Sequence, residues 1–315
     1  HSRITISMKN VFQKTLSKSV SFKGVGLHSG KNVSIKVFPA KDNEGIVFKR
    51  VDLVKNNLIK ANFANVSSAK LCTTLKNRHG VKVSTVEHLL AALYLADIDN
   101  AIIEIDNNEV PIMDGSAKIF LESFKNLEVI NLKEKRKFLK IEEKIELIDG
   151  SKKISIEPSD DTFEVEFQLN YDNSIIGNQK NTINFDKDNF EDIYKSRTFC
   201  LYNDIEKIKK AGLAKGGSLD NAVVVNENQV LNEGGLRNKK EFVNHKILDL
   251  VGDFLLSGKR ILGKVKCYEG GHELTNKFLR KMFSSDLDLK KLNANKSKIA
   301  EKFVTNQSTK LAVNA

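Results

Sequence analysis

The sequence predicts an α+β fold made of two similar domains that pack together. In each half of the chain, apolar and polar residues alternate along several short segments, as in strands with one buried face. These strands precede one amphipathic helix that carries a histidine, and a further strand and helix follow it in both halves. The length of 315 residues agrees, because it suits one large domain or two of about 150 residues.

The first half begins with a strand-rich region at residues 14–60, in which Val33, Ile35 and Val37 alternate towards one face. A helix is expected to start near Ser84, because apolar residues then recur at helical spacing. The other elements expected in this half are a Gly-rich turn at 24–30, a turn at 41–44, a strand at 101–105, a turn at 109–115 and a helix at 116–127.

The second half repeats this order after the basic segment 128–137, which is expected to be a linker. Segment 196–235 is extra material inside this half. From residue 285 onward the chain is polar and rich in Lys and Asn, as in a weak helix or a loose tail. The elements expected in this half are strands at 138–148, 152–158 and 163–171, a helix at 241–257, a strand at 261–268 and a helix that begins near His272.

These elements predict the domain boundaries. An N-terminal α+β domain at 8–130 contains the first His-bearing helix, and a C-terminal α+β domain at 136–285 contains the second. Residues 286–315 form the polar tail. Met8 is expected to be the native first residue, with residues 1–7 as a remnant ahead of it.

The composition is that of an ordinary globular protein, with 40% hydrophobic and 29% charged residues. The longest apolar stretch, residues 89–96, ends at Asp97 and is far shorter than the ~20 residues that cross a bilayer. No secretory signal is visible. The odd number of cysteines, without a CxxC pair, argues against a disulfide framework and a zinc ribbon, and favours the cytoplasm. These cysteines are Cys72, Cys200 and Cys267.

The net charge of +11 has several interpretations. Lysines are scattered, with short basic runs at 133–137 and 208–210, and no aromatic-interleaved basic stripe or nucleic-acid motif is present. Nucleic-acid binding is therefore disfavoured. Attraction to an anionic substrate and attraction to an anionic membrane face fit the charge equally well.

Two helices far apart in the sequence each offer residues of the kind that bind metals. His245 and Asp249 are four residues apart on one helix, so their side chains lie roughly 5–6 Å apart at Cβ on the same face. His88 follows Glu87 at the start of the other helix. Two histidines, an aspartate and a neighbouring glutamate suit a catalytic zinc, which takes three protein ligands and needs a base. The alternatives are a solvated His–Asp pair and a histidine that is merely packed.

Two further residues have a structural and a chemical interpretation. Glu87 is either a catalytic carboxylate or the third residue of a capping box whose N-cap is Ser84. His272 follows two glycines at a helix start, where it is either a proton donor with a near-neutral pKa or an ordinary helix residue. The Gly-rich segments 24–30 and 215–221 match neither a Walker nor a dinucleotide pattern, and no HExxH motif occurs.

Seven segments, taken together, resemble the zinc-dependent UDP-3-O-acyl-N-acetylglucosamine deacetylases of lipid A synthesis. They occur in the order of that family and are spread over roughly residues 9–285. The segments are GVGLHSG (24–30), STVEHLLAAL (84–93), IDNAIIEI with EVPIMDGSA (98–117), SRTFCLYNDIE (196–206), GLAKGGSLDNAVVV (212–225), FVNHKILDLVGD (242–253) and GGHELTN (270–276).

The resemblance implies layered domains with their helices packed between them and an active site at the domain interface. It implies one Zn²⁺ per chain, a general base and a general acid near it, and accessory residues for the oxyanion and the charge balance. The implied metal ligands are His88, His245 and Asp249, the base is Glu87, the acid is His272, and the accessory residues are Thr198, Lys246 and Asp253.

The resemblance also implies that the insert 196–235 forms a passage for an acyl chain. Cys200, where a small residue is more usual, and the bulky strand Val223–Val225 depart from the family pattern and would alter the passage. The candidates for lining the passage are Phe199, Leu201, Leu213 and Ala222, and the candidates for contacting the nucleotide or sugar are Tyr171 and His28.

The implied reaction is removal of the N-acetyl group from UDP-3-O-(3-hydroxyacyl)-N-acetylglucosamine, the early committed step of lipid A synthesis. The implied protein is a cytoplasmic monomer that binds this UDP-linked acylated amino sugar, binds no nucleic acid and makes at most peripheral contact with the inner membrane. The alternatives are the same zinc chemistry on another N-acyl sugar, and a basic module that binds nucleic acid or lipid.

Overall fold

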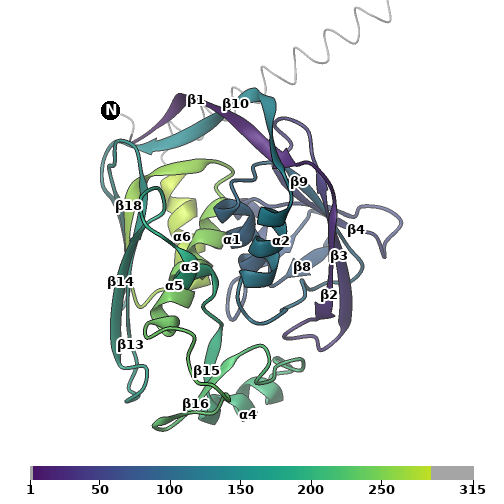
Figure 1. Ribbon diagram of the computed structural model, residues 1–315. Coiled ribbons are helices and arrows are strands. Elements are labelled where there is room, and N and C mark those ends of the chain that lie inside the picture. The colour runs from purple at the N-terminus through teal and green to yellow at the C-terminus, as the bar shows by residue number, and fades with distance from the viewer. Residues whose placement is uncertain (1–2, 285–315) are drawn as a thin grey trace, which may run out of the picture.

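The computed structural model describes residues 3–284, so the predicted tail at 286–315 lies outside the described residues. Two main sheets face each other across a layer of helices (Figure 1). The smaller sheet has five strands in the order β2–β3–β9–β4–β5. Their bounds are Val20–Val25 for β2, Asn32–Pro39 for β3, Ala101–Ile105 for β9, Ile46–Arg50 for β4 and Leu58–Lys60 for β5.

The larger sheet has seven strands, of which five repeat the order of the smaller sheet. The strand order β11–β12–β18–β13–β14 in this sheet corresponds to β2–β3–β9–β4–β5 in the smaller one, with β18 and β9 as the central strands. Each central strand pairs antiparallel on one side and parallel on the other. The predicted repeat of two similar domains is therefore confirmed by the strand order. The bounds are Ile145–Asp149 for β11, Lys152–Glu157 for β12, Arg260–Tyr268 for β18, Phe163–Asn170 for β13 and Asn178–Asn184 for β14.

The two remaining strands of the larger sheet correct the prediction of a linker at 128–137. This segment belongs to the long strand β10, Val129–Ile141, which pairs with β1, Ile4–Leu16. Exposed Lys and Glu residues gave β10 the composition of a loop, but its backbone groups are paired along β1. Residues 4–7, expected to be a remnant, are part of β1 and pair with β10.

Six helices are present in residues 3–284, and the His-bearing helices α1 and α5 precede the central strands as predicted. None of the helices in this part of the chain is long and apolar enough to cross a membrane. Their bounds are Glu87–Leu95 for α1, Lys118–Asn126 for α2, Glu191–Tyr194 for α3, Tyr202–Lys210 for α4, Glu241–Leu255 for α5 and His272–Met282 for α6, and a 3-10 turn lies at Phe63–Asn65.

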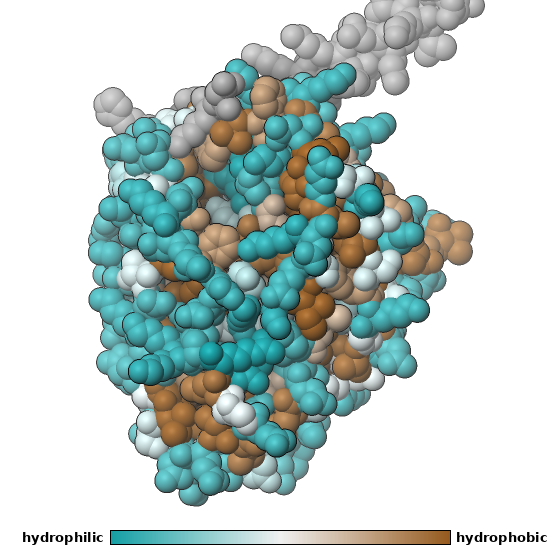
Figure 2. All heavy atoms as spheres, viewed as in Figure 1, coloured by the Kyte–Doolittle hydropathy of each residue, from teal (hydrophilic) through white to brown (hydrophobic). Residues whose placement is uncertain are grey.

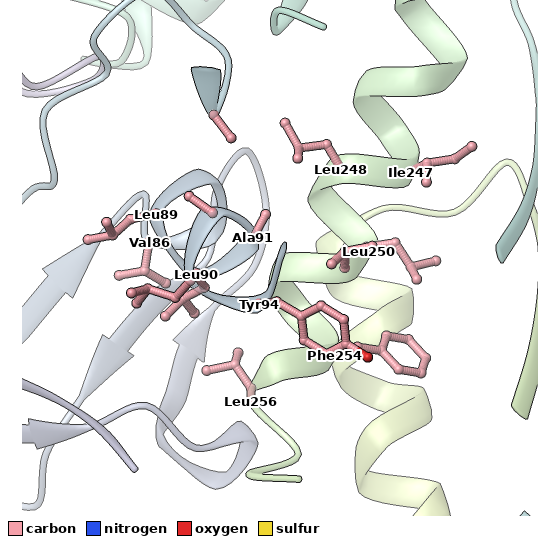
Figure 3. Packing of buried hydrophobic residues seen from close by; sticks show 14 of the residues in the cluster. Val86, Leu89, Leu90, Ala91, Tyr94, Ile247, Leu248, Leu250, Phe254 and Leu256 are labelled. Atoms are coloured by element: carbon pink, nitrogen blue, oxygen red, sulfur yellow. The ribbon is translucent and has the colours of Figure 1, made fainter. Parts of the chain in front are cut away.

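Helices α1 and α5 lie against each other in the central layer, and their apolar side chains form the core around them (Figure 3). The close approach depends on Gly252 of α5. A Cβ atom on this residue would lie 2.1 Å from the backbone carbonyl oxygen of Glu87 and 3.2 Å from the amide nitrogen of Ala91. The absence of a side chain at this one position therefore allows the two helix backbones to touch.

The start of α1 corrects the capping-box interpretation of Glu87. Ser84 is the last residue of strand β8, and Thr85 then adopts a left-handed backbone conformation with φ of 57°. The N-cap is Val86, and no side chain caps the helix. Glu87 is consequently the first residue of α1 and has no capping role.

Two small sheets complete the fold. The first connects the smaller sheet to α1, and the second, together with α4, forms the insert at the bottom of Figure 1. Their strands are β6 at Val66–Ser68, β7 at Thr74–Lys76 and β8 at Lys82–Ser84, and β15 at Phe199–Leu201, β16 at Val223–Asn226 and β17 at Gln229–Val230.

Candidate active site

The contact between α1 and α5 brings the three predicted metal ligands together. Nε2 of His88 lies 3.1 Å from Oδ1 of Asp249, and Nε2 of His245 lies 3.3 Å from the same oxygen. One ligand atom from each residue lies within 4.8 Å of the other two. Both histidines are buried, and Asp249 is half-buried.

The cluster fits a zinc ion. Zinc binds imidazole nitrogen and carboxylate oxygen at about 2.0–2.2 Å, so tetrahedral geometry separates neighbouring ligand atoms by about 3.4 Å. The nitrogen–oxygen separations of 3.1 and 3.3 Å agree with that spacing. Burial opposes the charge on Asp249, but His245 and His272 hold the pKa of its carboxyl well below the usual range, as an anionic ligand requires.

A buried support orients His245. Nδ1 of His245 lies 2.9 Å from the carbonyl oxygen of Ser196 and donates to it, so the other ring nitrogen, Nε2, faces the cluster. The next residue, Arg197, donates from its backbone nitrogen and from Nε to the carboxylate of Glu241, at 2.9 and 2.8 Å. Glu241 is fully buried at the start of α5. This ion pair therefore fixes the segment that supports a predicted metal ligand.

Glu87 and His272 face each other beside the cluster. Oε1 of Glu87 lies 3.4 Å from Nε2 of His272, and Nδ1 of His272 lies 2.5 Å from Oδ2 of Asp253. The hydroxyl of Thr73 donates to Oδ1 of Asp253 at 2.7 Å, and the backbone nitrogen of Thr73 donates to Glu87 at 3.3 Å. Thr73 thus links the two carboxylates.

The surroundings shift the pKa of both residues. Burial raises the pKa of the Glu87 carboxyl to about 7, although His272 and His88 pull it downward. Burial lowers the pKa of His272, but Asp253, Glu87 and Asp249 outweigh this effect and raise it to about 10. The predicted near-neutral pKa of His272 was therefore wrong, because three carboxylates from distant segments surround it.

The predicted accessory residues Lys246 and Thr198 lie on α5 and at the start of the insert. Nζ of Lys246 lies over the ring of Phe167 and 3.6 Å from where a Cβ atom of Gly271, the neighbour of His272, would be. Thr198 follows the segment that supports His245, and its backbone nitrogen donates to the carbonyl of Gly115 at 2.8 Å.

The insert reaches the metal cluster through Phe199. The ring of Phe199 lies 5.0 Å from the ring of Phe242, 6.5 Å from the ring of His245 and 5.8 Å from the ring of Tyr171. Tyr171, a candidate for contacting the nucleotide or sugar, therefore lies next to a candidate for lining the passage. The other passage candidates differ in burial, since Ala222 is buried while Leu201 and Leu213 are half-buried.

His28 lies elsewhere, where the turn at 24–30 meets the insert. Its Nδ1 accepts a hydrogen bond from the backbone nitrogen of Ala214 at 3.2 Å, while its Nε2 is buried without a hydrogen-bond partner in residues 3–284. Glu109 fixes the turn, because its carboxylate accepts from the backbone nitrogens of His28 and Ser29 and from the hydroxyl of Thr85 just before α1.

Four supporting residues escaped the sequence analysis. Glu241 had a weak signal, because an acid at a helix start is favourable, but its partner lies 44 residues away. Glu109 and Arg197 lie in segments that resemble the family, but no local pattern shows that they or Thr73 support the site, because their partners are also distant. These supporting residues are Thr73, Glu109, Arg197 and Glu241.

Comparison with known proteins identifies the family. A family model for UDP-3-O-acyl N-acetylglycosamine deacetylase matches residues 13–284. The chain belongs to this family. The deacetylase match covers every site residue predicted above, and the resemblance inferred from the seven segments is confirmed.

Individual deacetylases of the family are similar over most of their length. The UDP-3-O-acyl-N-acetylglucosamine deacetylase of Geotalea uraniireducens (strain Rf4) is 42% identical over 274 residues, which cover 87% of this chain and 89% of that protein. The enzyme of the same name from Pseudoalteromonas translucida (strain TAC 125) is 42% identical over 277 residues, covering 87% and 91%. That of Haemophilus influenzae (strain PittEE) is 41% identical over 276 residues, covering 87% and 90%. The protein is accordingly a hydrolase of the deacetylase type.

Proposed function

We propose that the protein is a zinc-dependent enzyme that hydrolyses the acetamide of UDP-3-O-(3-hydroxyacyl)-N-acetylglucosamine in lipid A synthesis, giving acetate and the free amine. One observation carries the proposal: Glu87 and His272, 3.4 Å apart, lie beside three ligand atoms that are within 4.8 Å of one another. A base, an acid and a metal site in one buried group are what amide hydrolysis requires.

The ligands in the proposal are His88, His245 and Asp249. Zinc bound there would polarise the acetamide carbonyl and lower the pKa of the attacking water. Glu87 accepts a proton from that water as its oxygen bonds to the carbonyl carbon. The pKa of about 7 suits this role, because a base works best when its pKa is near the working pH.

His272 completes the reaction as the proton donor. The carbon–nitrogen bond of the amide breaks as Nε2 of His272 gives its proton to the leaving nitrogen, which cannot depart as an anion. Asp253 positions the imidazolium through the 2.5 Å contact at Nδ1. In the same proposal the hydroxyl of Thr198 donates to the developing oxyanion, and Lys246 balances charge or holds a substrate phosphate.

The substrate assignment uses the insert and the half-buried rings beside the cluster. The acyl chain is proposed to run from the metal site past Phe199. The ring of Phe199 supports this path because it lies 6.5 Å from the ring of His245. Tyr171 and His28 are proposed to contact the nucleotide or the sugar, and the unpartnered Nε2 of His28 supports this role. The remaining proposed lining residues are Leu201, Leu213 and Ala222.

The proposed setting is the cytoplasm, with the enzyme acting as a monomer. The proposed partner is the UDP-linked acylated amino sugar. Nucleic acid is not a proposed partner, and contact with the inner membrane is peripheral at most.

The test measures acetate release from UDP-N-acetylglucosamine and from its 3-O-acylated form, together with zinc content. We expect turnover of the acylated substrate only. Glu87→Ala and His272→Ala should each lower turnover at least about a hundredfold, with zinc near one per chain. His79→Ala, at an exposed histidine, is the matched control and should retain activity. Loss of zinc in either variant, or near-normal turnover, would contradict the assigned roles.

A further inference from the structure

Most of the net positive charge of the chain arises in one segment, because its lysines and arginines have few acidic neighbours in the sequence. Residues 49–82 contain eight lysines and arginines and a single acidic residue, Asp52, so this segment carries +7 of the net +11. The cations are Lys49, Arg50, Lys55, Lys60, Lys70, Lys76, Arg78 and Lys82.

Large apolar side chains are exposed within the same region. The loop between β4 and β5 carries Val51, Leu53 and a fully exposed Val54, and it ends at Leu58, which is 57% exposed. Figure 2 shows hydrophobic side chains that protrude at the right margin, where the loop after β4 projects in Figure 1. Exposed apolar clusters of this kind mark contact surfaces.

The cations and the apolar loop lie side by side, because two hairpins are joined at their ends. Nδ2 of Asn77, in the β7–β8 turn, donates to the carbonyl oxygens of Asn56 at 2.7 Å and Leu58 at 3.1 Å. Nη1 of Arg50 donates to the carbonyl of Lys82 at 2.8 Å. We call the joined surface the basic hairpin face; it consists of Val51, Leu53, Val54, Lys55, Leu58, Lys76, Arg78 and Lys82.

The acidic groups near this face leave most of its charge uncompensated. Asp52 is paired with Arg50 at 2.7 Å, and Glu104 of β9 lies opposite Lys49 in the sheet register. Neither Arg50 nor Lys49 is therefore counted in the basic hairpin face. Its own cations, Lys55 and the three near the β7–β8 turn, are exposed.

We propose that the basic hairpin face docks the protein on an anionic phospholipid surface. Each lysine or arginine near such a surface is attracted to the negative headgroups, and the apolar loop enters the interface beside them. Single-stranded nucleic acid fits less well, because its bases stack on aromatic side chains. The one aromatic residue of segment 49–82, Phe63, instead stacks on Phe283 at 4.9 Å.

The docking surface uses none of the proposed catalytic, metal or substrate residues. Its test therefore stands apart from that of the deacetylase reaction, and deacetylation serves as a check that each variant is folded. In the proposed function, docking would let the enzyme exchange an acylated substrate or product next to the lipid surface.

The experiment is cosedimentation of the full chain with vesicles of pure phosphatidylcholine or an equimolar mixture of phosphatidylcholine and phosphatidylglycerol. We expect binding to the mixed vesicles only, and loss of binding at about 0.5 M salt, where the Debye length shrinks to roughly 4 Å. Val54→Asp and the double variant Lys55→Glu/Arg78→Glu should each weaken binding at least about tenfold. Deacetylation of a free substrate should not change.

The matched controls lie on the other sheet. Ile148→Asp replaces an apolar side chain that is 62% exposed, and Lys152→Glu reverses an exposed charge, so both should bind vesicles like the parent protein. Three results would overturn the proposal. They are equal binding to neutral and anionic vesicles, an equal loss of vesicle binding in the control variants, and binding of a single-stranded RNA oligonucleotide in place of the vesicles. Inorganic phosphate should not compete, since the face is proposed to recognise a surface.

Discussion

Replacing Gly252 with alanine tests whether the contact between α1 and α5 holds the metal cluster in place. Two effects oppose each other. Alanine is a better helix former than glycine, which stabilises a helix interior by about 1 kcal/mol. The new Cβ atom, however, would lie 2.1 Å from the carbonyl oxygen of Glu87, on the neighbouring helix. The sign of the result shows which effect dominates.

The steric effect should dominate. Real Cβ atoms stay at least 3.0 Å from such atoms, so the Cβ atom and the carbonyl must separate by about 0.9 Å. Overpacking of this kind costs about 1–3 kcal/mol, and the upper end applies here because a backbone atom cannot rotate away. After the helix-propensity gain, we expect a net loss of about 2 kcal/mol in the free energy of unfolding. That loss lowers the melting midpoint by roughly 4–8 °C.

The same movement should weaken metal binding. His88 belongs to α1 and Asp249 to α5, and their ligand atoms are 3.1 Å apart. Moving the helices apart by about 0.9 Å stretches this separation to about 4 Å, beyond the roughly 3.4 Å that tetrahedral zinc spans. We expect zinc affinity to fall about 10–100-fold, and turnover to fall about a hundredfold, since a 1 Å misplacement has that effect.

Two measurements compare the Gly252→Ala variant with the parent protein. Competition with a chelating dye gives the zinc affinity, and thermal unfolding of the metal-free protein gives the effect on packing alone. Asn203→Ala, at an exposed position of α4, is the control for helix propensity and should leave both quantities unchanged or raise the midpoint slightly. A Gly252→Ala protein that melts at a higher temperature and keeps its zinc affinity would refute the steric argument.

Two further changes test the supporting residues. Thr73→Val keeps the shape of a buried side chain but removes the 2.7 Å hydrogen bond to Asp253, so turnover should fall about tenfold at constant zinc content, as measured by acetate release and metal analysis. Unchanged turnover would show that this hydroxyl is dispensable. Burial opposes the charge on Glu241, but Arg197 outweighs the effect of burial and lowers the pKa of this carboxyl below 4.5. The contribution of Glu241 to the stability of the fold is therefore present above pH 4.5 and is lost in more acidic solution. In urea titrations, Glu241→Gln should therefore be less stable than the parent protein at pH 7 and should lose less stability on acidification; parallel pH curves would contradict this.

The order of elements could be predicted because local patterns determine it. The predicted helix at 241–257 is found at Glu241–Leu255, and the predicted strand at 261–268 is found at Arg260–Tyr268. The errors arose where distant partners decide the conformation. Strand β10 is stabilised by pairing with β1, and Ser84 stays in β8 because it pairs with Thr74. Neither pairing can be inferred from the composition of the segment itself.

The site shows the same limit. Spacing alone placed His245 and Asp249 on one helical face, and their ligand atoms are 3.3 Å apart. That His88 joins them was a hypothesis from residue type, with a merely packed histidine as the alternative, and the family resemblance implied the metal-binding role, because no local pattern connects α1 to α5. The high pKa of His272 was missed for a related reason, since the carboxylates of Glu87 and Asp253 reach it from two other helices.

The duplicated fold explains why the proposed ligands come from two helices that are far apart in the sequence. In each repeat the His-bearing helix immediately precedes the central strand, α1 before β9 and α5 before β18. Each helix therefore carries only part of the proposed ligand set, and the set is complete where the two helices touch at Gly252. A metal held by both helices binds the packed state and not the separated one, so metal binding and domain packing must stabilise each other by the same free energy. It follows that a substitution at the contact between the helices changes metal affinity even when it touches no ligand.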